Sequence, residues 1–172
     1  MINRKAEKVR FTIIDTLICP VAIATSKDGI SYIELNCRDI KKFERGIAKL
    51  FGEPVVFKPT DPILKRAALQ LNEYFKGRRH SFNLPLDLRL EGFTRRVLEE
   101  VARIPYGKTA TYGEVARRVG SPRSARAVGG AVGANPIPII IPCHRVVAAG
   151  GKLGGFGCGI ALKKKLFDLE KI

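Results

Sequence analysis

The chain has 172 residues, of which 45% are hydrophobic and 27% are charged, which predicts one large or two small globular domains and excludes fibrous and disordered proteins. Its 31 lysine and arginine residues against 16 acidic residues give a net charge of +15, which favours nucleic acid as a partner or, alternatively, a lysine-rich surface of a heat-adapted protein. No run is long enough to span a membrane, and MINRKAEKVR lacks the apolar stretch of a signal peptide, so we expect a cytoplasmic protein with no membrane partner.

The first half of the chain is expected to form a small antiparallel sheet followed by two helices. The segments FTIIDT, VAIAT and ISYIEL are rich in β-branched residues and are separated by short turns such as SKDG. Asp39 opens a helix, DIKKFERGIAKLF, and Asp61 caps a second helix with Pro62 at its first position and Gly77 at its end. The residues predicted on the apolar face of the earlier helix are Ile40, Phe43, Ile47, Leu50 and Phe51. Neither helix brings reactive groups together, so this half is interpreted as a scaffold.

Residues 77–92, GRRHSFNLPLDLRLEG, break the periodicity with glycine, proline and mixed polarity. We therefore predict a scaffold domain over residues 1–88, with a linker from about residue 77, and a second domain over residues 89–172. The second half is expected to contain helices at about 93–103, 111–119 and 123–132, a long irregular segment, and a last helix from about residue 160. The fold class is α+β, with a mainly helical second domain.

The stretch TYGEVARRVGSPRSARAVGGAV has the proportions of a helix-turn-helix, with the turn at GSP. Ser121 is predicted to cap the second helix, with Pro122 at its first position. Four arginines flank the turn and form a candidate phosphate-facing surface: Arg117, Arg118, Arg123 and Arg126.

The second helix of this motif carries small residues where a reader of the major groove would carry Asn, Gln or Arg. These residues are Ala125, Ala127, Gly129, Gly130 and Ala131. Each glycine within a helix costs about 1 kcal/mol relative to alanine, so some compensation is expected. Such a slim helix could enter a minor groove with Arg126 as its one long side chain, or it could pack against a neighbouring helix.

The segment IPCHRVVAAGG raises the question whether Cys143 is a buried apolar thiol, a metal ligand or a nucleophile. The four cysteines, Cys19, Cys37, Cys143 and Cys158, show no C-x-x-C spacing, and only His80 and His144 could join them, so no metal site is expected. A nearby base and a positive field would favour a nucleophilic thiolate. On an extended strand, however, His144 and Cys143 would point to opposite faces.

The residues ARAVGGAVGANPIPIIIPCHRVV, with TYGEVA before them and LGGFGCGIALKKKLFDLE after them, resemble the O6-alkylguanine-DNA alkyltransferases, also called methylated-DNA-protein-cysteine methyltransferases. The resemblance spans about residues 92–172 and implies a ribonuclease-H-like scaffold in the first domain. It also implies direct, stoichiometric transfer of an alkyl group from O6-alkylguanine, and from O4-alkylthymine, to Cys143. The expected partner is double-stranded DNA with the damaged base flipped through the minor groove, bound by a monomer without cofactor.

The resemblance also implies roles for individual residues. His144 would accept the thiol proton through a water and be oriented by Glu170, while Tyr112 would favour base rotation and assist protonation of the leaving guanine. Arg126 would fill the stack vacated by the base, and Asn135 would organise the helix-turn-helix against the cysteine loop. Further DNA contacts are implied at Thr111, Arg123, Ala125, Ala127, Gly129 and Gly130. The pocket would be lined by Pro138, Arg145, Val146, Phe156, Gly157 and Cys158.

Two features depart from the family pattern or lie outside it. Gly157 and Cys158 stand where relatives often carry a small hydroxyl residue or alanine and then glycine, so the alkyl-group preference is not set by the resemblance. Cys158 is interpreted as a bystander thiol rather than a secondary acceptor, and Cys19 with Cys37 would form a disulfide if the source is a hyperthermophile.

Two other functions are compatible with this architecture. A non-catalytic lesion binder would share the fold but lack the acceptor cysteine. A helix-turn-helix regulator that senses alkylation or oxidation through its cysteine would need sequence-specific binding, which a helix of alanines and glycines supports poorly.

Overall fold

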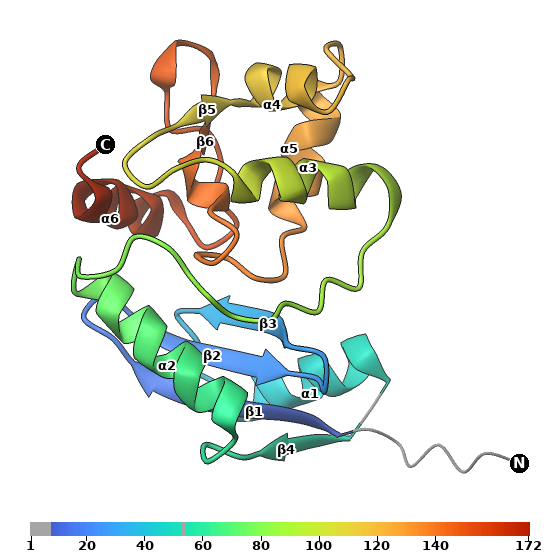
Figure 1. Ribbon diagram of the computed structural model, residues 1–172, viewed down its shortest axis with the longest axis vertical. Helices are drawn as coiled ribbons and strands as arrows, with labels where there is room; N and C mark the ends of the chain where they lie inside the picture. Colours follow the sequence, from blue (N-terminus) through green and yellow to red (C-terminus); the bar gives the residue numbers. More distant parts are fainter. Residues whose placement is uncertain (1–7, 53) are drawn as a thin grey trace, which may run out of the picture. The chain divides into compact units, whose positions relative to one another are not determined.

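The computed structural model describes residues 8–52 and 54–172, which form two compact units that divide between Asp87 and Leu88 (Figure 1). Residues 1–7, on which part of the signal-peptide expectation rests, lie outside the described residues. Among the helices described, none is long and apolar enough to cross a lipid bilayer.

The first unit contains a four-stranded sheet in the order β3-β2-β1-β4. Strands β1 (Val9–Asp15), β2 (Pro20–Thr25) and β3 (Ile30–Leu35) pair antiparallel, as their alternation predicts. The antiparallel sheet is thus confirmed for these three strands, and a fourth strand that was not predicted, β4 (Val55–Phe57), adds to it by pairing parallel with β1. Three residues are too few to show a period, which explains why β4 was not predicted.

Both helices of this unit begin at the predicted aspartates. Helix α1 (Ile40–Phe51) follows Asp39, whose carboxylate accepts the backbone N–H of Lys42. Helix α2 (Pro62–Phe75) follows Asp61, whose carboxylate accepts two backbone N–H groups of the first turn. A side chain that caps free N–H groups in this way fixes where a helix starts.

The two helices cover opposite faces of the sheet, with α2 in front and α1 behind in Figure 1. Helix α1 buries Phe43 and Ile47 against the sheet. Phe51 is half-buried, whereas Ile40 and Leu50 are 51% and 60% exposed, so the predicted apolar face is too wide by these two residues.

Part of the predicted linker, residues 85–87, pairs with Ile30 of β3 and so extends this sheet. The N–H of Ile30 donates to the carbonyl of Pro85 (2.8 Å), and the N–H of Asp87 donates to the carbonyl of Ile30 (2.9 Å). Gly29 allows this close approach, because a Cβ there would lie 2.4 Å from the Pro85 oxygen. In the same unit Cys19 and Cys37 are buried as thiols, so the disulfide considered above is not formed in this structure.

The second unit is mainly helical. Its helices are α3 (Gly92–Ala102), α4 (Tyr112–Arg118), α5 (Ala125–Gly133) and α6 (Ile160–Glu170). Its short elements are β5 (Ala110–Thr111), β6 (Val146–Val147) and the 3₁₀ turns η1 (Cys143–Arg145) and η2 (Ala149–Gly151). Strands β5 and β6 pair parallel, which joins the start of α4 to the chain that follows Cys143.

The turn between α4 and α5 differs from the prediction. The N–H of Ser124 donates to the carbonyl of Ser121 (2.9 Å), so residues 121–124 form a β-turn with Pro122 at its second position. Proline is favoured there because its fixed φ matches the turn. Ser121 therefore does not cap α5, which begins at Ala125.

Candidate active site

The reactive cysteine lies on a turn rather than on an extended strand. Cys143, His144 and Arg145 form η1, in which the N–H of Arg145 donates to the carbonyl of Pro142 (2.9 Å). All three side chains are buried. Because the chain turns here, neighbouring side chains no longer alternate, and the extended strand on which Cys143 and His144 would point to opposite faces is not formed.

Asn135 organises the loop that leads to Cys143. Its Nδ2 donates to the carbonyl of Ile141 (2.9 Å), and its Oδ1 accepts the N–H of Ile137 (3.0 Å). Ile139, between these two residues, has a φ of 74°, which is rare for a β-branched residue. Ile137, Ile139 and Ile141 are all buried, so packing and the Asn135 bonds hold this strained loop in one conformation.

Cys143 lines a cavity of about 270 Å³, a size near the lower end for small-molecule sites. The wall is shared by the start of α4, the end of α5, the cysteine loop and the segment before α6. The lining residues are Tyr112, Gly129, Val132, Gly133, Asn135, Pro138, Cys143, Gly155, Phe156, Gly157 and Cys158. Most of the residues implied for the site and pocket are thus brought together around one thiol.

Arg145 and Val146 do not line this cavity, contrary to the implied assignment. Val146 is fully buried in β6. The Arg145 guanidinium is directed to Glu170, with Nε donating to Oε2 (2.9 Å) and Nη2 to Oε1 (3.0 Å). A third bond runs from Nη1 to the carbonyl of Ile104 (2.5 Å), so the guanidinium stabilises the structure around the cavity without lining it.

Glu170 accepts hydrogen bonds from two segments of the second unit, η1 and the loop at Gly107. Besides Arg145, it accepts Nε2–H of His144 at Oε1 (2.7 Å) and the backbone N–H of Gly107 at Oε2 (3.1 Å). Its side chain is fully buried, as is that of His144. A buried carboxylate with this many charged and neutral donors fixes both the tautomer and the orientation of the imidazole ring.

Burial shifts both members of the cysteine–histidine pair toward their neutral forms. It raises the pKa of Cys143 to about 11, against a smaller lowering by the hydrogen bond to Asn135. It lowers the pKa of His144, although the hydrogen bond and charge of Glu170 oppose this change. At neutral pH the resting site therefore holds a thiol next to a neutral imidazole, which is the protonation state that a base-assisted nucleophile requires.

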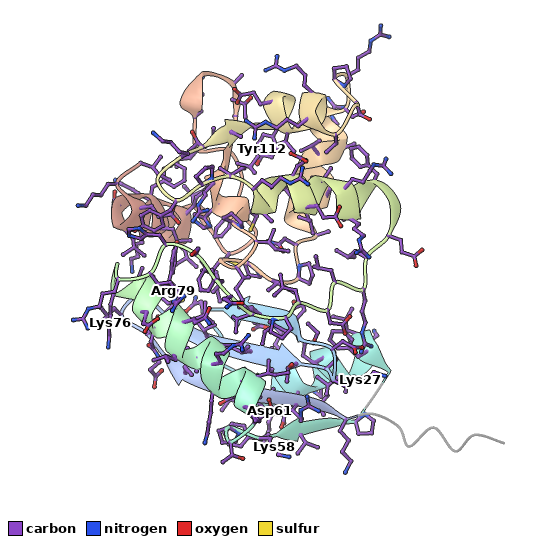
Figure 2. All side chains as sticks on the ribbon, in the orientation of Figure 1. Lys27, Lys58, Asp61, Lys76, Arg79 and Tyr112 are labelled. Carbon is purple, nitrogen blue, oxygen red and sulfur yellow. The ribbon has the colours of Figure 1, made fainter. Side chains whose placement is uncertain are left out.

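Tyr112 is the first residue of α4 and is labelled in Figure 2. The helix starts with a capping box, in which Thr111 Oγ1 accepts the N–H of Glu114 (3.1 Å) and Glu114 Oε2 accepts the N–H of Thr111 (2.6 Å). Thr111, an expected DNA contact, is thus half-buried with its hydroxyl in the cap. Burial, and then the charge of Cys143, raises the pKa of Tyr112, which keeps the phenol protonated.

The outer face of α5 is narrow and cationic. Arg123, before the helix, is exposed together with Arg126, Ala127 and Gly130, whereas Ala125 and Gly129 are half-buried. A Cβ on Gly130 would meet nothing within 4 Å, and one on Gly129 would make only an ordinary contact with Tyr112 at 3.9 Å. Packing inside this unit therefore does not require glycine at these positions, which weighs against the packing alternative and in favour of an external surface approaching the helix.

One buried residue of the site was missed from the sequence. Lys163 is fully buried, and its Nζ donates to the carbonyls of Val146 (2.6 Å), Leu153 and Gly155 (3.4 Å). It belongs to the run KKK, which is typical of an exposed helix face. The available signal was its spacing from Leu166 and Glu170, which puts all three on one face of α6.

No cluster of three or more potential metal ligands occurs within residues 8–52 and 54–172.

Two family models match the chain. Residues 9–88 match "6-O-methylguanine DNA methyltransferase, ribonuclease-like domain", and residues 92–172 match "6-O-methylguanine DNA methyltransferase, DNA binding domain".

Among similar proteins are two named methylated-DNA–protein-cysteine methyltransferase. The protein of Mycobacterium bovis is 54% identical over 102 residues, which is 59% of this chain and 62% of that protein, so the match spans less than two thirds of the relative. The protein of Methanosarcina acetivorans is 36% identical over 160 residues, or 93% of this chain and 97% of that protein.

Among solved structures, OGT of Mycobacterium tuberculosis in complex with DNA is 38% identical, with a TM-score of 0.79 over 95% of this chain and 92% of that chain. The O6-methylguanine methyltransferase of Mycobacterium tuberculosis gives a TM-score of 0.78 at 39% identity, over 95% of this chain and 93% of that chain. O6-methylguanine-DNA methyltransferase of Pyrococcus kodakaraensis gives 0.69 at 26% identity, over 95% of this chain and 99% of that chain.

Proposed function

The chain belongs to the 6-O-methylguanine DNA methyltransferase family, and we propose that it repairs O6-alkylguanine and O4-alkylthymine in duplex DNA by transferring the alkyl group to Cys143. The observation that carries the proposal is a buried thiol that lines a base-sized cavity and is followed in η1 by a histidine bonded to a buried carboxylate.

The reaction is a displacement at the alkyl carbon. The sulfur of Cys143 bonds to this carbon, the bond from the carbon to guanine O6 breaks, and its electron pair goes to the guanine. The thiol proton leaves toward His144 through a water. Because Nε2 of His144 is bonded to Glu170, this proton reaches the ring at Nδ1.

Tyr112 serves the leaving group. It lines the same cavity as Cys143, and its raised pKa keeps a proton on the phenol oxygen. This hydroxyl donates toward the guanine as negative charge develops there. The proton held by His144 then returns through water to the phenolate that Tyr112 leaves, so the net result is transfer of the thiol proton to the released guanine.

The DNA side of the mechanism relies on α5. A base inside a duplex cannot reach a buried thiol, so it has to be rotated out of the stack into the cavity. The slim outer face of α5 would enter the minor groove, Arg126 would fill the vacated stack, and Arg123 would contact phosphate. Contacts of this kind do not depend on base sequence, which suits a protein that scans all DNA.

The protein acts once, as a monomer and without a cofactor. The thioether formed on Cys143 offers no easy leaving route, so the acceptor is consumed and the reaction is stoichiometric.

The test is the mass of the intact protein after incubation with a duplex that contains O6-methylguanine. The expected result is a gain of one methyl group, which Cys143→Ala abolishes and the matched control Cys158→Ala retains. No gain, with tight binding to the lesion preserved, would instead indicate a lesion-binding protein in which Cys143 is structural.

A further inference from the structure

Lys163 is a buried cation whose hydrogen bonds go to backbone carbonyls. Its three contacts come from Val146, directly after η1, and from Leu153 and Gly155, in the segment that leads to the cavity rim. An ammonium group has three N–H donors, so these bonds use all of them. A single side chain thus ties β6 to the cavity wall at Gly155.

The two buried cations of this region, Arg145 and Lys163, differ in whether they are paired with a carboxylate. The nearby cation Arg145 is compensated by Glu170 through two hydrogen bonds. For Lys163, Cys143 is the group among the described residues whose negative charge raises its pKa, against the lowering caused by burial. In return, the charge of Lys163 adds a small lowering to the pKa of Cys143, which burial raises, and to the pKa of His144, which burial lowers. The charge of Lys163 therefore acts on Cys143 and His144, because its hydrogen bonds go to neutral carbonyl groups and not to a carboxylate.

We propose that Lys163 is a positioning residue for Cys143, which fixes the cavity wall through three carbonyls and places a buried positive charge that stabilises the thiolate during attack. The inference rests on the proposed function in that it takes Cys143 as the acceptor. Burial makes formation of the thiolate costly, and a buried positive charge whose own hydrogen bonds go to neutral carbonyl groups lowers this cost.

The expected size of the effect follows from two opposing trends. Each unit by which the pKa of a mostly protonated thiol rises lowers the thiolate fraction about tenfold. The intrinsic nucleophilicity of the thiolate rises at the same time, with a Brønsted coefficient of about 0.4–0.5, so the net loss of rate is about threefold per unit. A cation also attracts an anionic reagent directly, and this attraction is a readout that loss of packing alone does not change.

The experiment measures labelling of Cys143 by iodoacetamide, which is neutral, and by iodoacetate, which is anionic, in the full chain without DNA. The rates come from the mass of the peptide that contains Cys143. The variants are Lys163→Gln, which keeps donors and removes charge, and Lys163→Arg, which keeps charge. The matched control is Lys165→Gln, which removes an exposed charge from the same helix.

For Lys163→Gln we expect iodoacetamide labelling to fall at least about threefold and iodoacetate labelling to fall at least about fivefold more. Lys163→Arg and Lys165→Gln should keep the ratio of the two rates within about twofold of the unmodified chain. Equal losses with both reagents in Lys163→Gln, or an equal change of the ratio in Lys165→Gln, would overturn the proposal.

If Lys163→Gln does not fold, as judged by its thermal melt, the unmodified chain still decides the question. Cys158 is an exposed thiol at the same cavity and serves as an internal reference. The ratio of iodoacetate to iodoacetamide labelling should be higher at Cys143 than at Cys158, and a ratio that is equal or lower would overturn the proposal. Because labelling needs no DNA, a chain that shows the expected ratio but transfers no methyl group would contradict the proposed function and leave the assignment of Lys163 intact.

Discussion

Nε2 of His144 lies 2.7 Å from Oε1 of Glu170, and neither side chain is exposed to solvent. The same carboxylate holds the Arg145 guanidinium through two bonds. One residue of α6 thus orients the base beside Cys143 and neutralises a buried cation. The chemistry and the stability of this unit consequently depend on the same side chain.

Glu170→Gln is expected to damage both properties. Loss of the charge leaves Arg145 buried without its counterion, which should lower the free energy of unfolding by about 3 kcal/mol. Misorientation of His144 should slow methyl transfer about 100-fold in single-turnover assays. Glu99→Gln, which breaks an exposed pair with Arg95, is the matched control and should change neither quantity appreciably. Unchanged thiol reactivity in Glu170→Gln would remove Glu170 from the mechanism.

The stability of the protein should depend on pH through His144. Burial lowers its pKa in the folded state below the ordinary 6.5, so the unfolded chain takes up the proton first as pH falls. The contribution is present above about pH 6.5 and is lost as pH falls toward the lowered folded pKa, with a slope of at most about 1.4 kcal/mol per pH unit. The measurement is denaturant unfolding over this range, compared with His144→Gln. Parallel curves for the two proteins would contradict the prediction.

Arg126→Ala should separate repair of duplex DNA from chemistry at the thiol. The exposed arginine of α5 does not line the cavity of Cys143, so its loss should slow repair of a duplex lesion at least about tenfold and leave the reaction with free O6-methylguanine base unchanged. Arg95→Ala removes another exposed arginine, from α3, and serves as the control. Equal losses on both substrates would argue against a role in base rotation.

Gly130→Leu tests whether α5 enters a groove. The position is open and helical, so leucine should raise the free energy of unfolding by about 0.5–1 kcal/mol. The added bulk should nevertheless weaken binding to duplex DNA by about tenfold or more, as measured by fluorescence anisotropy. Gly46→Leu, at an equally open position in α1, should give the same gain in stability without loss of binding. If both variants bind DNA equally well, the outer face of α5 is not in the groove.

Gly154→Ala probes the support of Tyr112. Gly154 has a φ of 65°, and a Cβ there would lie 3.3 Å from Cε2 and 3.4 Å from the hydroxyl of Tyr112. Gly150, with a φ of 73° and nothing within 4 Å, carries the same backbone penalty without this contact. Both alanine variants should lose about 1 kcal/mol of stability, and only Gly154→Ala should slow methyl transfer, by about tenfold. Equal transfer rates would show that Tyr112 tolerates the displacement.

Much of the first unit could be predicted because its signals are local. Alternation marks β1 to β3, and Asp39 and Asp61 each cap the helix that follows them. Strands β4, β5 and β6 have two or three residues, which is less than any period needs. Their existence depends on partners that are distant in the chain.

The site was predicted from a motif, and the errors arose where tertiary contacts override local patterns. Pro122 looked like the start of a helix but completes a turn with Ser121, and the chain turns at Cys143 because a 3₁₀ turn follows Pro142. Arg145 is predicted to line the pocket, but its guanidinium bonds to the buried carboxylate of Glu170 instead. Lys163 was missed because it belongs to a run of three lysines, which is typical of an exposed helix face.

The placement of Glu170 and Lys163 on α6 has a consequence for biosynthesis. Cys143 leaves the ribosome before either residue, so during translation its thiol has neither an oriented base nor a buried cation beside it. It behaves until then as an ordinary thiol. Docking of α6 completes the site, so base-assisted alkyl transfer to Cys143 begins only once this unit has folded.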